Sequence, residues 1–432
     1  MTGFARLLIH VFFQEVEVEC GENLPASGPV VVVANHTNGL VDGLLLMATL
    51  RRYPRFLGKS TLFKIAPLWP FLKFAGVVPV YRAIDGASGD QNASAFATCD
   101  RILAQGGIVA VFPEGISHDE ASLQPLKTGA ARIALEGGIE GGAPDLVTVA
   151  VGLTYDAKAR FRSRALVRVD QPAPVARRRE CYERDSHEAV RRFTLDLADR
   201  LSAVSPSYAS WAQATQLSQV AEIVVRQPQG IVSPVPLADQ VGVAEALAQV
   251  AQARPGDENL AELVATFAAY RRDLDLLGLS DSQLAAAYRR GHVRASSAWS
   301  VVKILAAVPV ALVGVAVHII PFQIMKQVAK APRNEGMKAT VKLLGCFASF
   351  TLVYAILGFF VGRALGAWLG LLAALAAPLC GYVSVRLGER VQRVGGLLEG
   401  YRIVSARRTD LDSVLVHRAQ VVDAARSVLA AP

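Results

Sequence analysis

The sequence predicts an α/β domain with a mixed, largely parallel sheet flanked by helices, then a helical region and a C-terminal transmembrane helical hairpin. Three observations lead to this prediction. Short apolar runs alternate with helical patterns over residues 15–175, which is typical of sheets built from strand–helix units. An Ala-, Gln- and Leu-rich stretch follows over 209–294. Two nearly uncharged segments within 341–385 are then long enough to cross a bilayer.

The elements of the first domain follow from hydrophobic periodicity. Short runs rich in β-branched residues predict strands, at 15–19, 30–34, 56–59, 77–81, 108–112, 147–154 and 165–169. Helical patterns are expected at about 41–50, 61–75, 91–105 and 127–135, with a charged helix at 176–203. The start of the chain, residues 1–13, is apolar but too short to span a bilayer and lacks a small-residue cleavage site. We expect it either to lie on a membrane surface as an interfacial helix or to cover the core.

The membrane region is predicted over residues 299–390. Segments 341–362 and 365–385 form the transmembrane pair, with the turn near Arg363. Segment 301–320 has basic residues on both sides, so the positive-inside rule gives it no orientation. We expect it to be re-entrant or surface-lying, with a full crossing as the alternative. The predicted parts are a first domain, a helical appendage, the membrane region and a cytosolic helical tail, at 1–204, 205–298, 299–390 and 391–432.

Composition limits the classes of partner. Hydrophobic residues make up 52%, charged residues 19%, and the mean hydropathy is +0.33, a balance that indicates membrane contact. The net charge of +8 suits anionic lipid or phosphorylated substrates. No run of Lys and Arg with interleaved aromatics occurs, so nucleic acid is not an expected partner. Five scattered cysteines without a C-x-x-C pair predict neither a disulfide framework nor a zinc site.

The strongest candidates for chemistry follow the buried strand 30–34. His36 and Asp42 stand there, in the stretch Asn35 to Asp42. A strand end can hold an imidazole against a carboxylate, and such a pair makes a base that removes a proton from a hydroxyl. A histidine at a strand end is often only structural, so the pair needs support from other blocks.

Three later blocks follow strands of the same predicted sheet. Arg82 closes the run 76–82 and can bind a phosphate through two nitrogens. Glu114 and Gly115 follow strand 108–112, and a glycine there lets backbone N–H groups approach an anion. Lys127 adds positive charge near a predicted helix start, and the end of strand 147–155 can line a pocket.

His118 stands in the sequence Ser117-His118-Asp119. Adjacent side chains on one loop rarely face one another, so this is not expected to be a hydrolase triad. We predict that His118 is a second site residue or a contact that stabilises the loop.

Taken in order, the four blocks resemble the glycerolipid acyltransferase superfamily, the family of 1-acylglycerol-3-phosphate acyltransferases. The resemblance covers residues 5–175 and implies a glycerol-3-phosphate acyltransferase-like fold. It implies that His36 is the general base and that Asp42 orients it, with Arg82 and, more weakly, Lys127 on the substrate phosphate. Glu114 and Gly115 would shape the acceptor site. No acyl-enzyme, metal or organic cofactor is implied, and acyl-CoA or acyl carrier protein would be the donor.

One departure from the commoner family pattern indicates which acceptor to expect. The commoner family pattern has four residues between His and Asp, whereas five stand here, Thr37 to Val41. The fungal-type acyltransferases of glycerol 3-phosphate and dihydroxyacetone phosphate have five, with a block similar to Phe112–Asp119. The resemblance therefore implies acyl transfer to glycerol 3-phosphate in phospholipid (phosphatidic acid) biosynthesis, by a membrane-bound enzyme whose catalytic domain faces the cytoplasm. The alternatives are 1-acylglycerol 3-phosphate or another lysophospholipid as acceptor, and a non-catalytic lipid-binding module.

Overall fold

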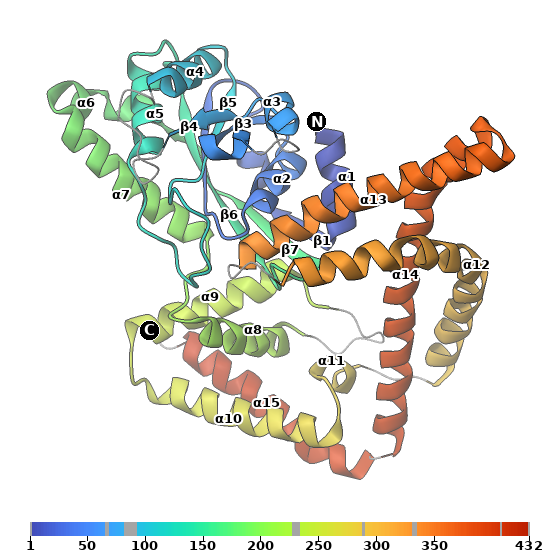
Figure 1. Cartoon of the computed structure of the whole chain (residues 1–432). Helices are drawn as coiled ribbons and strands as arrows, with labels where there is room; N and C mark the ends of the chain where they lie inside the picture. The colour runs from blue at the N-terminus through green and yellow to red at the C-terminus, as the bar shows by residue number, and fades with distance from the viewer. Residues whose placement is uncertain are drawn as a thin grey trace. The chain divides into compact units, whose positions relative to one another are not determined.

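The computed structural model describes residues 2–64, 69–81, 93–226, 234–286, 290–330, 335–406 and 408–430. Two compact units divide them. The first comprises residues 1–207 and 332–340, and the second comprises 208–331 and 341–432. Figure 1 labels the helices and strands of both units.

The first unit contains an eight-stranded sheet in the order β1-β7-β6-β2-β5-β3-β4, with β8 paired to β6. Only β7 and β8 run antiparallel to their neighbour β6, and the other pairs are parallel. This confirms the predicted mixed, largely parallel sheet. The strands are β1 Phe13–Glu19, β2 Val30–Ala34, β3 Pro54–Lys59, β4 Val78–Val80, β5 Ile108–Val111, β6 Val147–Tyr155, β7 Ser163–Val169 and β8 Ala173–Pro174.

Helices cover both faces of the sheet (Figure 1). Val31 and Val33 of β2 pack in one core with α4, α5 and α7. The alternate residues, Val30 and Val32, are also fully buried, as expected for a central parallel strand. The helices of this unit are α1 Thr2–Phe12, α2 Leu40–Thr49, α3 Trp69–Phe74, α4 Ala93–Ala104, α5 Gly129–Ile139, α6 Arg179–Arg184 and α7 Ser186–Val204.

The N-terminal helix α1 covers the core with one of its faces, which was one of the two expectations. Ala5, Ile9 and Phe12 are buried, so one face of α1 covers the domain, and α1 packs against α2. Leu7 and Val11 remain exposed on the other face. Arg6 and His10 are exposed beside them, so the outer face of α1 is part apolar and part basic.

Two helix predictions were wrong in extent. The expected helix 61–75 consists, in the described residues, of a 3₁₀ turn Ser60–Lys64 and the short α3. Pro70 lies in the first turn of α3, where a proline is tolerated because its missing N–H has no partner there. The expected helix 176–203 is divided into a 3₁₀ turn, α6 and α7, since Asp185 leaves the helical conformation and caps α7 through Glu188 N–H at 3.0 Å.

The second unit is helical throughout its described residues, apart from the connections. Its helices are α8 Trp211–Val225, α9 Leu237–Ala253, α10 Glu258–Leu277, α11 Asp281–Leu284, α12 Arg290–Val328, α13 Glu335–Leu365, α14 Ala367–Ala406 and α15 Arg408–Ala430. Residues 335–340 at the start of α13 belong to the first unit. Three of these helices are long and apolar enough to cross a membrane, over Ala298–Val328, Thr340–Leu365 and Ala367–Ala406.

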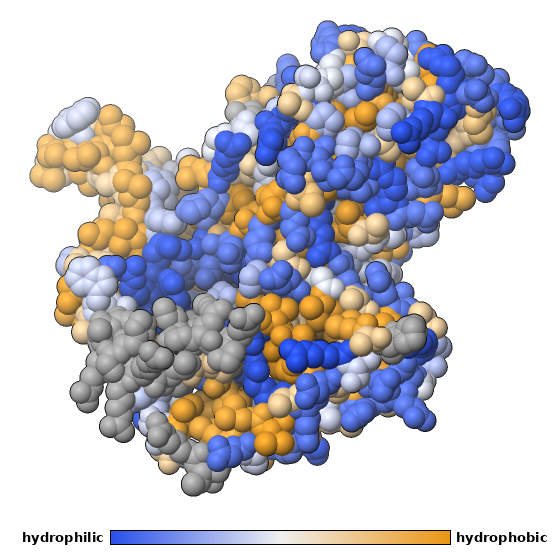
Figure 2. All heavy atoms as spheres, turned by 180° about the vertical axis from the view of Figure 1, so that it is seen from behind, coloured by the Kyte–Doolittle hydropathy of each residue, from blue (hydrophilic) through white to orange (hydrophobic). Residues whose placement is uncertain are grey.

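The helices α13 and α14 are joined at a single residue. Gly366 has φ +104, a conformation that favours glycine, so the turn falls three residues beyond the expected Arg363. Large apolar side chains around this turn are exposed, among them Phe360, Leu365 and Trp368. Figure 2 shows hydrophobic residues covering the protruding end where α13 and α14 meet. Such a surface indicates membrane association.

Candidate active site

The site begins where β2 ends. β2 pairs in parallel with β5 on one side and β6 on the other, so the three strands deliver their carboxyl ends to one edge. Asn35 extends this pairing with its side chain. Its Nδ2 donates to Leu153 O at 2.9 Å, and its Oδ1 accepts from Leu153 N–H at 2.7 Å. The loop after β2 is therefore fixed to β6 from its first residue.

His36 and Asp42 are brought together in the loop and helix that follow. His36 Nδ1 lies 2.9 Å from Asp42 Oδ2, although five residues separate the two in sequence. Gly39 makes this possible, because its φ +56 and ψ −129 give a reversal that side chains disfavour. Asp42 lies in the first turn of α2, where the helix dipole stabilises a carboxylate.

Asp42 is fully buried, and both oxygens of its carboxylate accept hydrogen bonds. Asn38 N–H donates to Oδ2 at 2.7 Å, and Tyr155 OH donates to Oδ1. Burial raises the pKa of Tyr155 well above its usual value, and the neighbouring charge of Asp42 and the hydrogen bond to it add to the shift. The phenol therefore stays protonated and acts as a donor.

The imidazole of His36 is held in one orientation. A carboxylate only accepts hydrogen bonds, so the neutral ring carries its proton on Nδ1 and keeps a lone pair on Nε2. The ring stacks on Phe112, with centroids 4.2 Å apart and an interplanar angle of 15°. The His36 side chain keeps 20% of its surface exposed, while Asp42 has none. The arrangement can therefore take a proton from a hydroxyl at Nε2 and stabilise the imidazolium that results.

Glu114 binds the loop that carries His36. It is almost completely buried, and its Oε1 accepts from the backbone N–H of His36 at 2.7 Å. Oε2 contacts His118 Nε2 and accepts from Gln124 N–H at 3.0 Å. His118 N–H also donates to His36 O at 3.3 Å. Protein groups thus occupy both carboxylate oxygens, and His118 is a contact that ties the two loops together, one of the two predicted alternatives.

The remaining expected substrate-binding residues lie around the same turn. Gly115 has φ +75 and its N–H donates to Phe112 O at 3.1 Å, which closes the turn after β5. Lys127 is exposed, and its backbone N–H donates to Pro113 O at 2.7 Å. Its side chain runs close to Gly115, because a Cβ added there would lie 3.4 Å from Lys127 Cγ. Arg82 lies outside the described residues.

Comparisons with known proteins address this same part of the chain. Residues 15–151 match the family model described as Acyltransferase. Residues 15–151, which are less than half of the chain, thus form an acyltransferase domain. The matched range contains His36, Asp42, Glu114, Gly115 and Lys127, while Tyr155 lies four residues beyond it.

Two curated relatives and one solved structure show the range of similarity. Glycerol-3-phosphate O-acyltransferase 2 of Saccharomyces cerevisiae is 28% identical over 179 residues, 41% of this chain and 24% of that protein. The 1-acyl-sn-glycerol-3-phosphate acyltransferase alpha of Ovis aries is 29% identical over 177 residues, 39% of this chain and 58% of that protein. The crystal structure of the 1-acyl-sn-glycerophosphate (LPA) acyltransferase from Thermotoga maritima has a TM-score of 0.34 and 21% identity. That match covers 46% of this chain and 75% of that one.

The alignments cover only part of the length of these relatives. The chain spans 24%, 38% and 10% of three fungal relatives that it matches. Two of these are named glycerol-3-phosphate O-acyltransferases, and the third is an uncharacterised acyltransferase. The relatives whose names give an acceptor are thus of two kinds, acyltransferases of glycerol 3-phosphate and of 1-acyl-sn-glycerol 3-phosphate.

Several contacts of the acyltransferase domain escaped the sequence prediction. Tyr155, Asn35 and Phe112 each position the His36–Asp42 pair, and none was expected to do so. Tyr155 could have been found, because strand 147–155 was expected to end at a pocket. The role of Asn35 depends on Leu153, which is 118 residues away in sequence. No local pattern reveals such a pairing.

Proposed function

We propose that this chain transfers a fatty acyl group from an acyl thioester to a hydroxyl of glycerol 3-phosphate, in the biosynthesis of phosphatidic acid. One observation carries the proposal. In a domain of the acyltransferase family, the buried Asp42 holds Nδ1 of His36 at 2.9 Å, so that Nε2 can act on a hydroxyl. No metal or organic cofactor enters the proposed reaction.

The proposed chemistry is a direct transfer. The acceptor O–H gives its proton to His36 Nε2, and the oxygen forms a bond to the thioester carbonyl carbon. The tetrahedral intermediate collapses with cleavage of the C–S bond, and the leaving thiolate takes the proton back from the imidazolium. Asp42 stabilises that imidazolium through Nδ1. Backbone N–H groups would stabilise the oxyanion.

The acceptor would be recognised mainly through its phosphate. Arg82 and Lys127 are the proposed phosphate contacts, since guanidinium and ammonium groups both bind phosphate well. Glu114 is proposed to shape the acceptor site indirectly, because its oxygens are bound to His36 N–H, Gln124 N–H and His118. Gly115 would shape it through the turn that it closes.

Two observations favour glycerol 3-phosphate as the acceptor. Five residues separate His36 from Asp42, as in the fungal-type enzymes, and two fungal relatives carry the name glycerol-3-phosphate O-acyltransferase. The second candidate is 1-acylglycerol 3-phosphate, which the sheep relative of 29% identity favours. The donor would be acyl-CoA or acyl carrier protein. Membrane lipid would surround the apolar helices, with the catalytic domain on the cytoplasmic side.

A thiol-release assay on membranes that contain the protein tests the proposal. Acyl-CoA is supplied with glycerol 3-phosphate or with its 1-acyl form, and His36→Ala is compared with the unchanged protein. We expect the rate to fall on the order of 10²–10⁴-fold, the usual contribution of a general base. His187→Ala is the matched control, since His187 is exposed on α7 and should leave the rate unchanged.

Each other outcome decides between the alternatives. Full activity of His36→Ala would overturn the mechanism. Preference for the 1-acyl acceptor would replace glycerol 3-phosphate by the second candidate. An unchanged protein that binds lipid vesicles but releases no thiol with either acceptor would favour the non-catalytic lipid-binding module.

A further inference from the structure

Helix α15 follows the three apolar helices in sequence but packs with the helices that precede them. It lies along α10 and also contacts α8 and α9. Val421, Ala425 and Val428 of α15 are fully buried, as is Tyr270 of α10. We call α8–α11 together with α15 the flanking bundle, because its members come from both sides of the apolar helices. Its shared core makes it one folded body.

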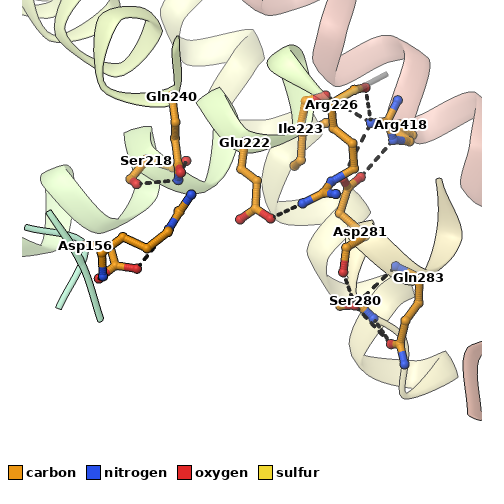
Figure 3. A network of polar contacts seen from close by, with 12 residues as sticks. Asp156, Ser218, Glu222, Ile223, Arg226, Gln240, Ser280, Asp281, Gln283 and Arg418 are labelled. Atoms are coloured by element: carbon orange, nitrogen blue, oxygen red, sulfur yellow. Dashed lines mark hydrogen bonds and ion pairs between the residues drawn. The ribbon is translucent and has the colours of Figure 1, made fainter. Parts of the chain in front are cut away.

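A buried ionic network joins the same helices (Figure 3). Asp281 of α11 binds Arg418 Nε of α15 at 2.8 Å and Arg226 Nε at 3.1 Å. Tyr270 OH donates to Asp281 Oδ1 at 2.7 Å. The three charged side chains are only 7–14% exposed. Removing one partner would leave an unpaired buried charge, so the network holds α15 firmly in place.

Arg418 also completes the end of α8. Its Nη2 donates to Ile223 O at 3.0 Å and to Arg226 O at 3.2 Å. Carbonyl groups at the end of a helix have no partner within the helix, and a cation there is favoured by the helix dipole. Helix α15 therefore supplies a group that α8 requires, and the bundle is incomplete without it.

This packing restricts how the chain can cross a membrane. The flanking bundle is charged and folded, so it cannot straddle a hydrocarbon layer about 30 Å thick. The chain therefore enters α12 and leaves α14 on the same side of the membrane, and the number of crossings between them is even. Yet three helices in the described residues have the length and apolarity of a span. We propose that α13 and α14 cross as a hairpin and that α12 stays on the side of the flanking bundle.

Contacts along α14 define its two ends. At one end, Gln283 Nε2 of α11 donates to Gly396 O of α14 at 2.9 Å, so the charged half of α14 belongs with the flanking bundle. At the other end is the turn at Gly366. Near that turn, the nearest atoms around Gly358, Gly362 and Gly370 all belong to α13 and α14. Small residues of this kind let two apolar helices approach closely within a membrane.

Helix α12 meets its neighbours far from the turn at Gly366. Ser384 Oγ donates to Ala311 O at 2.8 Å, and His318 Nε2 lies 2.7 Å from Tyr354 OH and packs on Gly381. Tyr354 and Gly381 are 12 and 15 residues from Gly366, about 18 and 22 Å along the helices.

Beyond His318, α12 turns back toward the start of α13. Met325 packs on Gly345, near that start, and Figure 1 shows that α12 is bent and that its second half runs across α14. Pro309 and Pro321 lie within α12, and prolines are common causes of helix bends. The end of α12 thus lies beside the first part of α13, at the end of the α13–α14 hairpin away from the turn at Gly366, as the proposal requires.

The distribution of charge supports the same choice. A crossing by α12 would carry Lys326, Lys330 and Lys338 to the far side, whereas the hairpin carries only Arg363 near its turn. Basic residues are retained on the cytoplasmic side of membranes. Of the arrangements with two crossings, the α13–α14 hairpin moves the fewest positive charges.

Single cysteines in sealed vesicles test the proposal. The five native cysteines are replaced by serine or alanine, and one cysteine is then placed at Leu276 of α10, Val416 of α15, Lys330 or Leu365, which are all exposed. A membrane-impermeant maleimide is added to vesicles of both orientations. We expect Leu276→Cys, Val416→Cys and Lys330→Cys to be labelled from one side and Leu365→Cys only from the other. Each variant must be labelled in detergent, which shows that the thiol is reactive.

Three results would overturn the proposal. Labelling of Leu276→Cys and Val416→Cys from opposite sides would mean an odd number of crossings. Labelling of Lys330→Cys from the side of Leu365→Cys would mean that α12 crosses. Labelling of all four from one side would mean that no helix crosses. Trypsin digestion of the unchanged protein in the same vesicles gives an independent check that needs no variant, since cleavage after Lys330 and after Arg363 should require opposite orientations.

Discussion

The hydroxyl of Tyr155 donates a hydrogen bond to Oδ1 of Asp42. Through this bond the last residue of β6 supports the carboxylate that orients His36. Asp42 is buried and receives donors on both oxygens, so its charge is stabilised without water. The proposed base His36 thus depends on a contact between Asp42 and a residue 113 positions away from it in sequence.

Replacing Tyr155 with phenylalanine removes this donor and little else. The charge of Asp42 is then less compensated, so the carboxylate attracts the imidazolium that forms in the reaction more strongly. We expect the acidic limb of the pH profile of kcat/KM to move to higher pH, with KM for the acceptor unchanged. Tyr182→Phe is the matched control, because Tyr182 bonds Glu140 instead. A lower melting temperature with an unshifted profile would show that Tyr155 is only structural.

Asp42→Asn tests the orientation of His36. The amide can donate to Nδ1 and so favours the tautomer with its proton on Nε2, which cannot act as a base. We predict a fall in kcat on the order of 10²–10⁴-fold with little change in KM for the acceptor. Steady-state rates of thiol release measure both constants. A variant with the same kcat as the unchanged protein would contradict the role of Asp42.

The strands were largely predictable because their signals are local. The run Val30–Ala34 is apolar at every position, and its length suits a buried strand. His36, Asp42 and Glu114 follow two predicted strands, so the edge at which they gather could be inferred too. The pairing of β2 with β6 could not, since it joins residues about 118 apart. The contacts made by Asn35 and Tyr155 depend on that pairing and were missed for the same reason.

Variants of Glu114 distinguish positioning from substrate binding. Glu114→Ala leaves the buried N–H groups of His36 and Gln124 without an acceptor, which costs about 1–3 kcal/mol for each group. We expect lower thermal stability and lower kcat, because the His36 loop loses its support. A direct phosphate or hydroxyl contact would instead raise KM for the acceptor with kcat retained. Thiol-release kinetics at varied acceptor concentration separate the two results.

His118→Ala extends this test to the second partner of Glu114. The two side chains contact one another, Glu114 accepts from His36 N–H, and the His118 ring accepts from Glu120 N–H. Residues of one network have non-additive effects. The double variant Glu114→Ala/His118→Ala should therefore lose less than the product of the two separate losses in kcat. Fully multiplicative losses would mean that the residues act independently.

Asp100 of α4 is predicted to destabilise the fold at neutral pH. Partial burial raises its pKa, and the charges of Glu136 and Glu140 raise it further, while Oδ1 is buried without a hydrogen-bond partner. A raised pKa in the folded state means that stability is highest below the unfolded pKa and falls as pH rises through the folded pKa. Asp100→Asn should therefore raise the melting temperature at pH 7 and have a smaller effect near pH 4. Asp199→Asn, on the exposed face of α7, should change little at either pH. An Asp100→Asn variant that is less stable at pH 7 would show that the carboxylate has a compensating partner.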